Sequence, residues 1–455
     1  MRVVLQNPIN LSSIKRMFNA RSSKEDENVF INAISIDTRE LQKNDLFIPM
    51  KGERFDGEQF LNDSISIGAY ALSAKQSGKG VIRVENTAKA LLEIAKAYKS
   101  TLNIKKCIAI TGSVGKTTTK ELCVDILSRK YNVCGTYKNF NNEIGVPFTV
   151  LSASQKTEVL VIEAGMNHSG ELAAISNCIN PEICVITKIG NAHVGNLGSR
   201  KNIAEAKKEI LRGGENPTVI VPYDEPLLYN IKNRKTFSLN SANADFDFSL
   251  SDTEKRLYTF RHKHGLIKDL IIKNNHAHIP ECLGFAISAC IEAGMDDYEI
   301  KGAVNELEKM GNINTVKIGD ITVIDDSYNS SPEATEYAFK TLLAYPAKRR
   351  CALIGDMLEL GDESHVLHYR IGTLAADSKI DALYLFGHYS DCVKEGAIHH
   401  GISPNSIFVN KNTSDFFATA EQIVRNSRDG DVILFKASHK LELRKIIEIL
   451  KNKYV

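Results

Sequence analysis

The stretch Ala109-Ile-Thr-Gly-Ser-Val-Gly-Lys-Thr-Thr-Thr-Lys120 decides the fold of this chain. The apolar residues 107–110 predict a short buried strand before the turn, and the apolar face of residues 121–127 predicts a helix after it. In a strand-to-helix turn, glycines allow successive backbone N–H groups to approach phosphate oxygens at the N-terminus of the helix. The stretch therefore predicts a phosphate loop, and with it a protein that binds a nucleoside triphosphate.

We predict different roles for the individual residues of this loop. Lys116 would reach the β- and γ-phosphates, and the hydroxyl of Thr117 would hold Mg²⁺. The residues expected to contact the nucleotide are Gly112, Ser113, Gly115, Lys116, Thr117 and Thr118. The spacing departs from the common phosphate loop, since Ile110 stands where its first glycine is expected. The alternative, an ordinary glycine turn with a solvated lysine, is disfavoured by the strand-to-helix context.

Length, composition and charge limit the class of protein. A chain of 455 residues is too long for one hydrophobic core, so two or three domains are expected. Contents of 43% hydrophobic and 25% charged residues are those of a soluble globular protein. The net charge of +2 gives no broad basic surface, and we therefore expect no nucleic-acid partner.

The spacing of the cysteines and the length of the apolar runs indicate the cellular location of the protein. The nine cysteines are scattered without a C-x-x-C pair, which indicates reduced thiols rather than a zinc site. Asn7, Pro8 and Asn10 interrupt the N-terminal apolar run, and no later run approaches membrane-spanning length. We expect a cytoplasmic location and no membrane insertion.

The pattern of apolar runs and turns changes twice along the sequence, which predicts an α/β protein of three domains. Residues 1–86 mix short apolar segments with glycine-rich and charged turns and predict a small α/β domain. In residues 87–312 the apolar runs 159–162, 184–187 and 219–221 alternate with helical patterns, which predicts a mostly parallel sheet around the phosphate loop. Residues 241–264 have poor periodicity and predict an antiparallel excursion or a loop. Residues 313–455 alternate again and predict a doubly wound, Rossmann-like domain.

Polar residues that end apolar strands are the first candidates for function, because ligands of open parallel sheets bind at the carboxyl ends of strands. Glu163 ends the run 159–162, and His193 lies in the loop after the run 184–187. If both strands neighbour the strand of the phosphate loop, a carboxylate and an imidazole lie beside the triphosphate, where Mg²⁺ needs ligands. Taken singly, each residue more often marks only a solvated turn.

Two further turns are dense in polar residues. In Asn139-Phe-Asn-Asn-Glu-Ile-Gly-Val-Pro147 the tandem asparagines suit a loop over a polar substrate, and a turn with a helix cap is an equally supported reading. The stretch Ile324-Asp-Asp-Ser-Tyr-Asn-Ser-Ser-Pro332 ends an apolar strand with carboxylates, an aromatic ring and an amide before a proline-led helix. Such a string could hold an amine or a ribose hydroxyl.

In this order, the motifs resemble one family over nearly the whole chain, the Mur ligases of peptidoglycan synthesis. The resemblance is to the type that adds D-alanyl-D-alanine to UDP-N-acetylmuramoyl-tripeptide, and its strongest carriers are Asp325-Asp-Ser-Tyr-Asn329 with Pro332, Asn141-Asn-Glu-Ile-Gly-Val-Pro147 and Gly355-Asp-Met-Leu-Glu-Leu-Gly361. The stretches Ser35-Ile-Asp-Thr-Arg39, 45–47 and 52–57 resemble the uridine-nucleotide domain of that type. The resemblance implies a UDP-substrate domain, a central ATPase domain and a C-terminal Rossmann-like domain.

The resemblance also implies the reaction. ATP would donate its γ-phosphoryl group to the terminal carboxylate of the peptide, and the amine of D-alanyl-D-alanine would attack the resulting acyl phosphate. The implied role is peptidoglycan precursor synthesis in the cytoplasm, and hence cell-wall biogenesis, cell shape and cell division. The implied partners are the two substrates, ATP and two Mg²⁺ ions, and we expect a monomer.

Site residues follow from the resemblance by position. Thr117 and Glu163 match the positions that hold one Mg²⁺, and His193 matches a ligand of the second. Lys207 falls at the lysine that the family carbamylates with CO₂, which turns a cation that repels Mg²⁺ into an anionic ligand. The implied catalytic residues are Lys116, Lys207 and His193, with Asp325 and Asn329 at the nucleotide and Ser35, Thr38, Arg39, Asn141, Asn142, Tyr328, Lys436 and Ser438 at the substrates.

Four departures from the family pattern keep two alternatives open. Lys188 follows Thr187 where an asparagine is usual, which predicts a cation near the metals. The adenine-side signature is represented only by residues 276–285, Gly311-Asn312 replaces Gly-Arg, and Lys436-Ala-Ser-His439 replaces Lys-Gly-Ser-Arg. The alternatives are a catalytically weakened, nucleotide-binding paralogue with a regulatory or assembly role, and a sibling ligase for another amino acid. The turn at 325–329 disfavours the sibling, and the retained phosphate-loop and metal residues favour the active enzyme.

The altered adenine side predicts weak binding of ATP with poor discrimination against GTP. Pro280 lacks a backbone donor and an ionised Glu281 only accepts, whereas the usual amide both donates and accepts. Each lost hydrogen bond should cost about 1 kcal/mol, or several-fold in affinity. Side-by-side KM values for ATP and GTP test this, and a strong preference for ATP with a low micromolar KM would contradict it.

Overall fold

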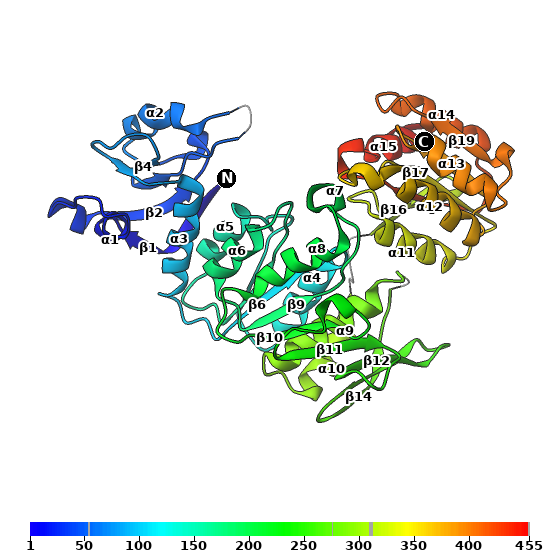
Figure 1. Cartoon of the computed structure of the whole chain (residues 1–455), viewed down its shortest axis with the longest axis horizontal. Helices are drawn as coiled ribbons and strands as arrows, with labels where there is room; N and C mark the ends of the chain where they lie inside the picture. Colours follow the sequence, from blue (N-terminus) through cyan, green and yellow to red (C-terminus); the bar gives the residue numbers. More distant parts are fainter. Residues whose placement is uncertain (53–54, 275, 309–312, 454–455) are drawn as a thin grey trace.

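The computed structural model describes residues 1–52, 55–274, 276–308 and 313–453, and it contains three sheets that follow one another along the chain (Figure 1). Figure 1 shows the first and third sheets on opposite sides of the central one. The altered hinge pair Gly311-Asn312 lies outside the described residues.

The first sheet has a mixed but mainly parallel order. Its strands lie side by side as β1 (Arg2–Asn10), β2 (Phe30–Ser35), β3 (Asp45–Phe47), β4 (Tyr70–Ser73) and β5 (Val81–Arg83), with helices α1 (Leu11–Met17) and α2 (Leu61–Ser66) between them. Only the pair β1 and β2 is antiparallel. Helix α3 (Thr87–Lys99) leads to the central sheet, and its Tyr98 hydroxyl donates to the Ala153 carbonyl oxygen at 3.0 Å.

The central sheet has the order β14-β13-β12-β11-β10-β9-β6-β8-β7. The bounds are β6 (Lys106–Thr111), β7 (Val133–Gly135), β8 (Val159–Glu163), β9 (Ile183–Ile186), β10 (Thr218–Pro222), β11 (Arg234–Leu239), β12 (Phe246–Asp252), β13 (Leu257–His262) and β14 (Gly265–Ile271). From β12 to β7 all neighbours are parallel, and β12, β13 and β14 pair antiparallel. The predicted parallel sheet and the antiparallel excursion are both confirmed.

Helices cover this sheet and connect its strands. They are α4 (Lys116–Leu127), α5 (Gly145–Ser152), α6 (Glu171–Ile179), α7 (Val194–Leu197), α8 (Arg200–Lys208), α9 (Ile279–Glu292) and α10 (Asp297–Glu306). Strands β6, β8 and β9 are buried over almost their whole length because helices pack on both faces, which explains their continuous apolar runs. In the described residues, no helix combines the length and the apolar character needed to cross a bilayer.

The third sheet has the order β15-β16-β20-β17-β18-β19, and only β15 is antiparallel to its neighbour. Its elements are β15 (Asn314–Ile318), β16 (Ile321–Asp325), α11 (Pro332–Leu343), β17 (Arg349–Gly355), α12 (Ser364–Asp377), β18 (Ala382–Phe386), α13 (Ser390–His399), β19 (Ile407–Asn410), α14 (Phe416–Asn426), β20 (Asp431–Lys436) and α15 (Arg444–Lys453). The predicted Rossmann-like alternation is confirmed. Strand β15 was not predicted, because it is an edge strand with only one buried residue.

The strand order decides where the candidate site lies. Strand β6 lies between β8 and β9, and all three are parallel, so their carboxyl ends meet at one edge. The phosphate loop, Glu163 and the segment after β9 therefore emerge side by side. The condition placed on Glu163 and His193, that their strands neighbour the phosphate-loop strand, is met.

Candidate functional site

The phosphate loop joins β6 to α4 and is fixed by a neighbouring strand. Gly112 has φ +150° and Gly115 has φ +88°. A Cβ on Gly112 would lie 2.0 Å from Thr187 Oγ1, so only glycine allows the two segments to approach this closely. Thr187 Oγ1 donates to the Val114 carbonyl oxygen at 2.5 Å, and Lys116 Nζ donates to the Gly112 carbonyl oxygen at 2.8 Å. The loop is thus bound to the end of β9.

Ser113 holds the segment that follows β9. Its backbone N–H donates to the Lys188 carbonyl oxygen at 2.8 Å, and its Oγ accepts from the Gly190 N–H at 2.9 Å. Thr117 and Thr118 lie in the first turn of α4, where Thr117 is half-buried and Thr118 is buried. The predicted nucleotide residues therefore surround one helix N-terminus, which is a favourable place for phosphate.

Glu163 presents an unused carboxylate oxygen. The residue is 1% exposed, and its Oε1 accepts from Asn141 Nδ2 at 2.7 Å. Its Oε2 is buried and has no hydrogen-bond partner among the described residues. A buried acceptor of this kind calls for a ligand, and a carboxylate oxygen suits Mg²⁺.

The two asparagines of the predicted substrate loop have different positions. Asn141 orients Glu163, whereas Asn142 Oδ1 accepts from the Gly145 N–H at 2.8 Å at the start of α5. Asn142 therefore has the helix-capping role that the sequence analysis gave as the alternative. Asn141 instead lies beside Glu163 at the phosphate loop.

Lys207 is a buried amine. It lies in α8 and is 2% exposed. Burial lowers the pKa of Lys207 well below its usual value, and the nearby Lys116 lowers it further. Burial also lowers the pKa of Lys116, which Glu163 opposes. The free amine is the form of Lys207 that reacts with CO₂.

His193 has a left-handed backbone, with φ 65°, at the start of α7. Its Nδ1 lies 2.6 Å from Glu359 Oε2, which comes from the third-sheet region. Burial is the main cause that lowers the pKa of His193, Lys116 adds to it, and Glu359 acts against it. A neutral imidazole is the form that binds metals.

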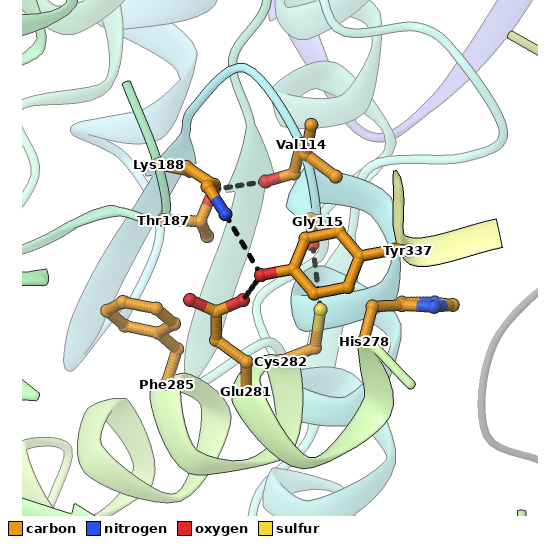
Figure 2. Close-up of a pocket in the computed structure, with 9 residues that line it drawn as sticks. All are labelled: Val114, Gly115, Thr187, Lys188, His278, Glu281, Cys282, Phe285 and Tyr337. Carbon is orange, nitrogen blue, oxygen red and sulfur yellow. Dashed lines mark hydrogen bonds between the residues drawn. The ribbon is translucent and has the colours of Figure 1, made fainter. Parts of the chain in front are cut away.

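A small pocket lies beside Gly115 and brings two of the departures from the family pattern together (Figure 2). It is lined by Val114, Gly115, Thr187, Lys188, His278, Glu281, Cys282, Phe285 and Tyr337. Lys188 Nζ donates to the Tyr337 hydroxyl at 3.0 Å, and that hydroxyl donates to Glu281 Oε2. Tyr337 belongs to α11 of the third-sheet region, so the bridge crosses two parts of the chain. The predicted cation beside the metals is instead directed to Tyr337.

The turn after β16 is held by cations. Asp325 Oδ2 accepts from Arg444 Nε at 3.1 Å. Lys436 Nζ lies 3.0 Å from Asp326 Oδ2 and donates to the Asn329 carbonyl oxygen at 2.5 Å. Nothing in the local sequence distinguished Arg444 from an ordinary helix cation, yet it supplies a guanidinium to Asp325 in this turn.

Two other predicted substrate residues lie around this turn. Tyr328 is 49% exposed, and its ring packs edge-on against His439 with centroids 5.6 Å apart. Ser438 is buried, and its Oγ accepts from the Leu358 N–H at 2.8 Å. Tyr328 therefore offers a free aromatic face, while Ser438 supports the loop 355–361.

The predicted uridine residues lie on the first sheet, apart from the phosphate loop. Ser35 is fully buried, and its Oγ donates to the Asp37 carbonyl oxygen at 2.9 Å. Arg39 is exposed and pairs with Asp37 at 2.6 Å, while Thr38 begins a short 3₁₀ turn. The structure thus gathers Ser35, Thr38 and Arg39 in one place and does not bring them to the phosphates.

Among the described residues, no three His, Cys, Asp or Glu side chains surround a common point. Mg²⁺ bound to a nucleotide takes most of its ligands from phosphates and water and needs only one or two protein groups. Thr117 and Glu163 fit that requirement.

Comparison with known proteins decides the family. The model of the Mur ligase middle domain matches residues 110–273, and that of the Mur ligase glutamate ligase domain matches residues 312–439. The UDP-N-acetylmuramoyl-tripeptide–D-alanyl-D-alanine ligase of Bacillus subtilis is 35% identical over 442 aligned positions, which cover 93% of this chain and 94% of that protein. The chain belongs to the Mur ligase family.

Solved structures show the same three-part fold for this Mur ligase. MurF from Acinetobacter baumannii superposes with a TM-score of 0.85 at 24% identity, covering 99% of this chain and 100% of that chain. The MurF ligase from Thermotoga maritima, solved in complex with ADP, gives a TM-score of 0.76 at 25% identity over 92% and 97% of the two chains. The Mur ligases are ATP-dependent peptide ligases, and this chain is an enzyme of that family.

Replacing Lys116 with alanine should abolish ATP turnover and leave the fold intact. The side chain gives one hydrogen bond within the loop, worth about 1 kcal/mol, whereas its charge acts on the transferring phosphoryl group. Turnover and thermal unfolding should be measured beside Lys105→Ala, since Lys105 is exposed and pairs with Glu158. Parent-like turnover in Lys116→Ala would contradict the assignment of the phosphate loop.

Proposed function

We propose that this Mur ligase joins D-alanyl-D-alanine to UDP-N-acetylmuramoyl-tripeptide with ATP, through an acyl phosphate. The observation that carries the proposal is a match over 93% of this chain to a ligase of that name. It is combined with a buried carboxylate oxygen on Glu163, beside the phosphate loop, that has no partner among the described residues. The domain limits proposed with it are 1–86 for the UDP-substrate domain, 87–312 for the ATPase domain and 313–455 for the Rossmann-like domain.

The chain's own groups support phosphoryl transfer by positioning and charge. The N–H groups of the loop and Lys116 would bind the β- and γ-phosphates, which fixes the γ-phosphorus for attack by the peptide carboxylate. Thr117 and Glu163 would hold one Mg²⁺, and His193 and a carbamylated Lys207 a second. The metal ions supply neutralisation of the negative charge on the oxygens.

Carbamylation of Lys207 is supported by its surroundings. A buried ammonium is costly, and the nearby charge of Lys116 repels it. The neutral amine can add to CO₂ with loss of a proton, and the product is an anionic oxygen ligand near Lys116. The buried position thus favours both the loss of a proton from the ammonium and the addition of the neutral amine to CO₂.

We assign the pocket beside Gly115 to the nucleotide base. It adjoins the phosphate loop, and Phe285 gives it an apolar wall. Glu281 can accept from an exocyclic amine of a purine once Tyr337 releases its carboxylate. Tyr337 and Lys188 would then form the edge of the bound base.

We assign the turn after β16 and the end of β20 to the ribose and to the amine substrate. Asp325 and Asn329 would contact the nucleotide, and Tyr328 and Lys436 would contact the incoming dipeptide. Ser438 would act through the loop 355–361, because its hydroxyl is bonded there.

A catalytically weakened paralogue stays the second candidate, favoured by His439 in place of the usual arginine. Arg444 weakens that argument, since it brings a guanidinium to Asp325 in the turn whose Tyr328 contacts His439. We further propose that the enzyme is a cytoplasmic monomer.

A coupled assay of ADP release tests the function. The reaction contains ATP with UDP-muramoyl-tripeptide, carrying lysine or diaminopimelate as third residue in separate arms, and D-alanyl-D-alanine. ADP release should require both substrates and yield the pentapeptide product. Release that continues with a single amino acid in place of the dipeptide would favour a sibling ligase, and no release in either arm would favour the paralogue.

Replacing Lys207 with alanine should lower kcat on the order of 100-fold or more, because a metal ligand is lost. Added bicarbonate should not restore the activity. Lys208→Ala is the matched control, since Lys208 pairs with Glu205 at 2.8 Å on the same helix. Carbon NMR with ¹³C-bicarbonate should detect a carbamate in the parent and in Lys208→Ala only. Parent-like turnover in Lys207→Ala would exclude the carbamate role.

A further inference from the structure

We propose that residues 187–195, here named the strap, couple the third-sheet region to the phosphate loop, and that Glu333 and Glu359 are positioning residues that act through it. The proposal deepens the proposed function and rests on it. The strap runs from the end of β9 to the start of α7 and carries His193.

The strap is bound to the phosphate loop on one side. Thr187 bonds the Val114 carbonyl oxygen, and the Lys188 carbonyl and the Gly190 N–H both bond Ser113. Three contacts of this kind within four residues leave the loop little freedom to move without the strap. The position of the strap therefore bears directly on the position of the N–H groups that face phosphate.

Glu333 binds the middle of the strap from the first turn of α11. Its Oε1 accepts from the Asn191 N–H at 2.9 Å and from Asn191 Nδ2 at 2.8 Å. A Cβ on Gly190 would lie 2.7 Å from Glu333 Cδ, so a larger residue there would displace the carboxylate from its present position. The second oxygen, Oε2, is buried and has no partner among the described residues. Both hydrogen bonds that this carboxylate accepts from the described residues come from Asn191 of the strap.

Glu359 and its neighbours bind the far end of the strap. The Glu359 carboxylate lies 2.6 Å from His193 Nδ1, and its carbonyl oxygen accepts from the Gly195 N–H at 3.1 Å. A Cβ on Gly195 would lie 2.5 Å from the backbone N of Gly361. Two backbones therefore meet without side chains between them, which fixes the loop 355–361 against the start of α7.

Lys188 adds a third connection, through its bond to Tyr337. The strap is thus hydrogen-bonded to the phosphate loop at residues 187, 188 and 190 and to the third-sheet region at residues 188, 191 and 195. His193 Nδ1 in addition lies beside the Glu359 carboxylate. A shift of the third-sheet region must move His193, the phosphate loop, or both. Neither Glu333 nor Glu359 needs to touch a substrate to have this effect.

The expected signature is a loss of kcat with little change in the KM for ATP. A misplacement of about 1 Å can lower the rate of a positioned reaction about 100-fold, while the groups that bind phosphate remain present. Glu333→Ala should therefore lower kcat on the order of 10- to 100-fold and change the KM for ATP by less than about threefold. Glu333→Gln should retain most of the activity, because its amide oxygen can accept both Asn191 bonds.

Matched variants separate positioning from a general loss of stability. Glu336→Ala is the control on α11, since Glu336 pairs with Lys340 on the same helix. Glu363→Ala is the control for Glu359→Ala, because Glu363 is exposed in the short 3₁₀ turn that follows the loop 355–361. Both controls should behave as the parent. A fall in kcat for Glu336→Ala equal to that for Glu333→Ala would overturn the proposal, as would parent-like kinetics in Glu333→Ala and Glu359→Ala.

A double-mutant cycle tests the contact itself. Gly190→Ala should push the Glu333 carboxylate from Asn191 and lower kcat as Glu333→Ala does, and in the Glu333→Ala background it should have less than about a twofold further effect. Additive losses would show that the two residues act independently and would overturn the coupling.

Amide hydrogen exchange gives a readout that does not depend on ligation. Glu333→Ala should speed exchange of the Asn191 amide, and Glu359→Ala that of the Gly195 amide, with the controls unchanged. Unchanged exchange would overturn the proposal. If the parent had no ligase activity and the two variants still showed faster exchange than the parent, the role of the strap would be supported and the proposed function would be refuted.

Discussion

The close approach of Gly112 and Thr187 is the constraint on which the site depends. It exists because β6 and β9 are parallel neighbours, so that the phosphate loop and the segment after β9 leave the sheet at the same edge. A methyl group at residue 112 would lie 2.0 Å from the Thr187 hydroxyl oxygen, and the loop geometry would be lost. The same strand order places Glu163 on the other side of β6, with one carboxylate oxygen unused.

The residues that depart from the family pattern contact one another or a compensating side chain. Lys188 and Glu281 are joined through Tyr337, so the cation and the carboxylate meet across the pocket (Figure 2). Arg444 supplies a guanidinium to Asp325, and His439, where the family resemblance implies an arginine, packs against Tyr328 of the same turn. A chain altered in this way keeps charge balance at both places, which favours an active enzyme over a weakened paralogue.

Buried parallel strands were predictable because they are continuous apolar runs, and the run 159–162 lies within β8. The phosphate loop was predictable because its glycines and lysine lie close together in the sequence. Glu333 and Glu359 were not, because a charged residue on a helix or loop is normally solvated and only tertiary docking gives it a partner. The burial of Lys207 was equally hidden, since α8 is highly charged and the family resemblance alone singled it out.

The transfer of oxygen from substrate to phosphate tests the central claim most directly. The peptide substrate is labelled with ¹⁸O in its terminal carboxylate and turned over with ATP and D-alanyl-D-alanine, and the released phosphate is analysed by mass. In an acyl phosphate one carboxylate oxygen is bonded to phosphorus, and attack of the amine on the acyl carbon releases it with phosphate. The account predicts one ¹⁸O atom in each phosphate released. Unlabelled phosphate, or label in AMP, would contradict it.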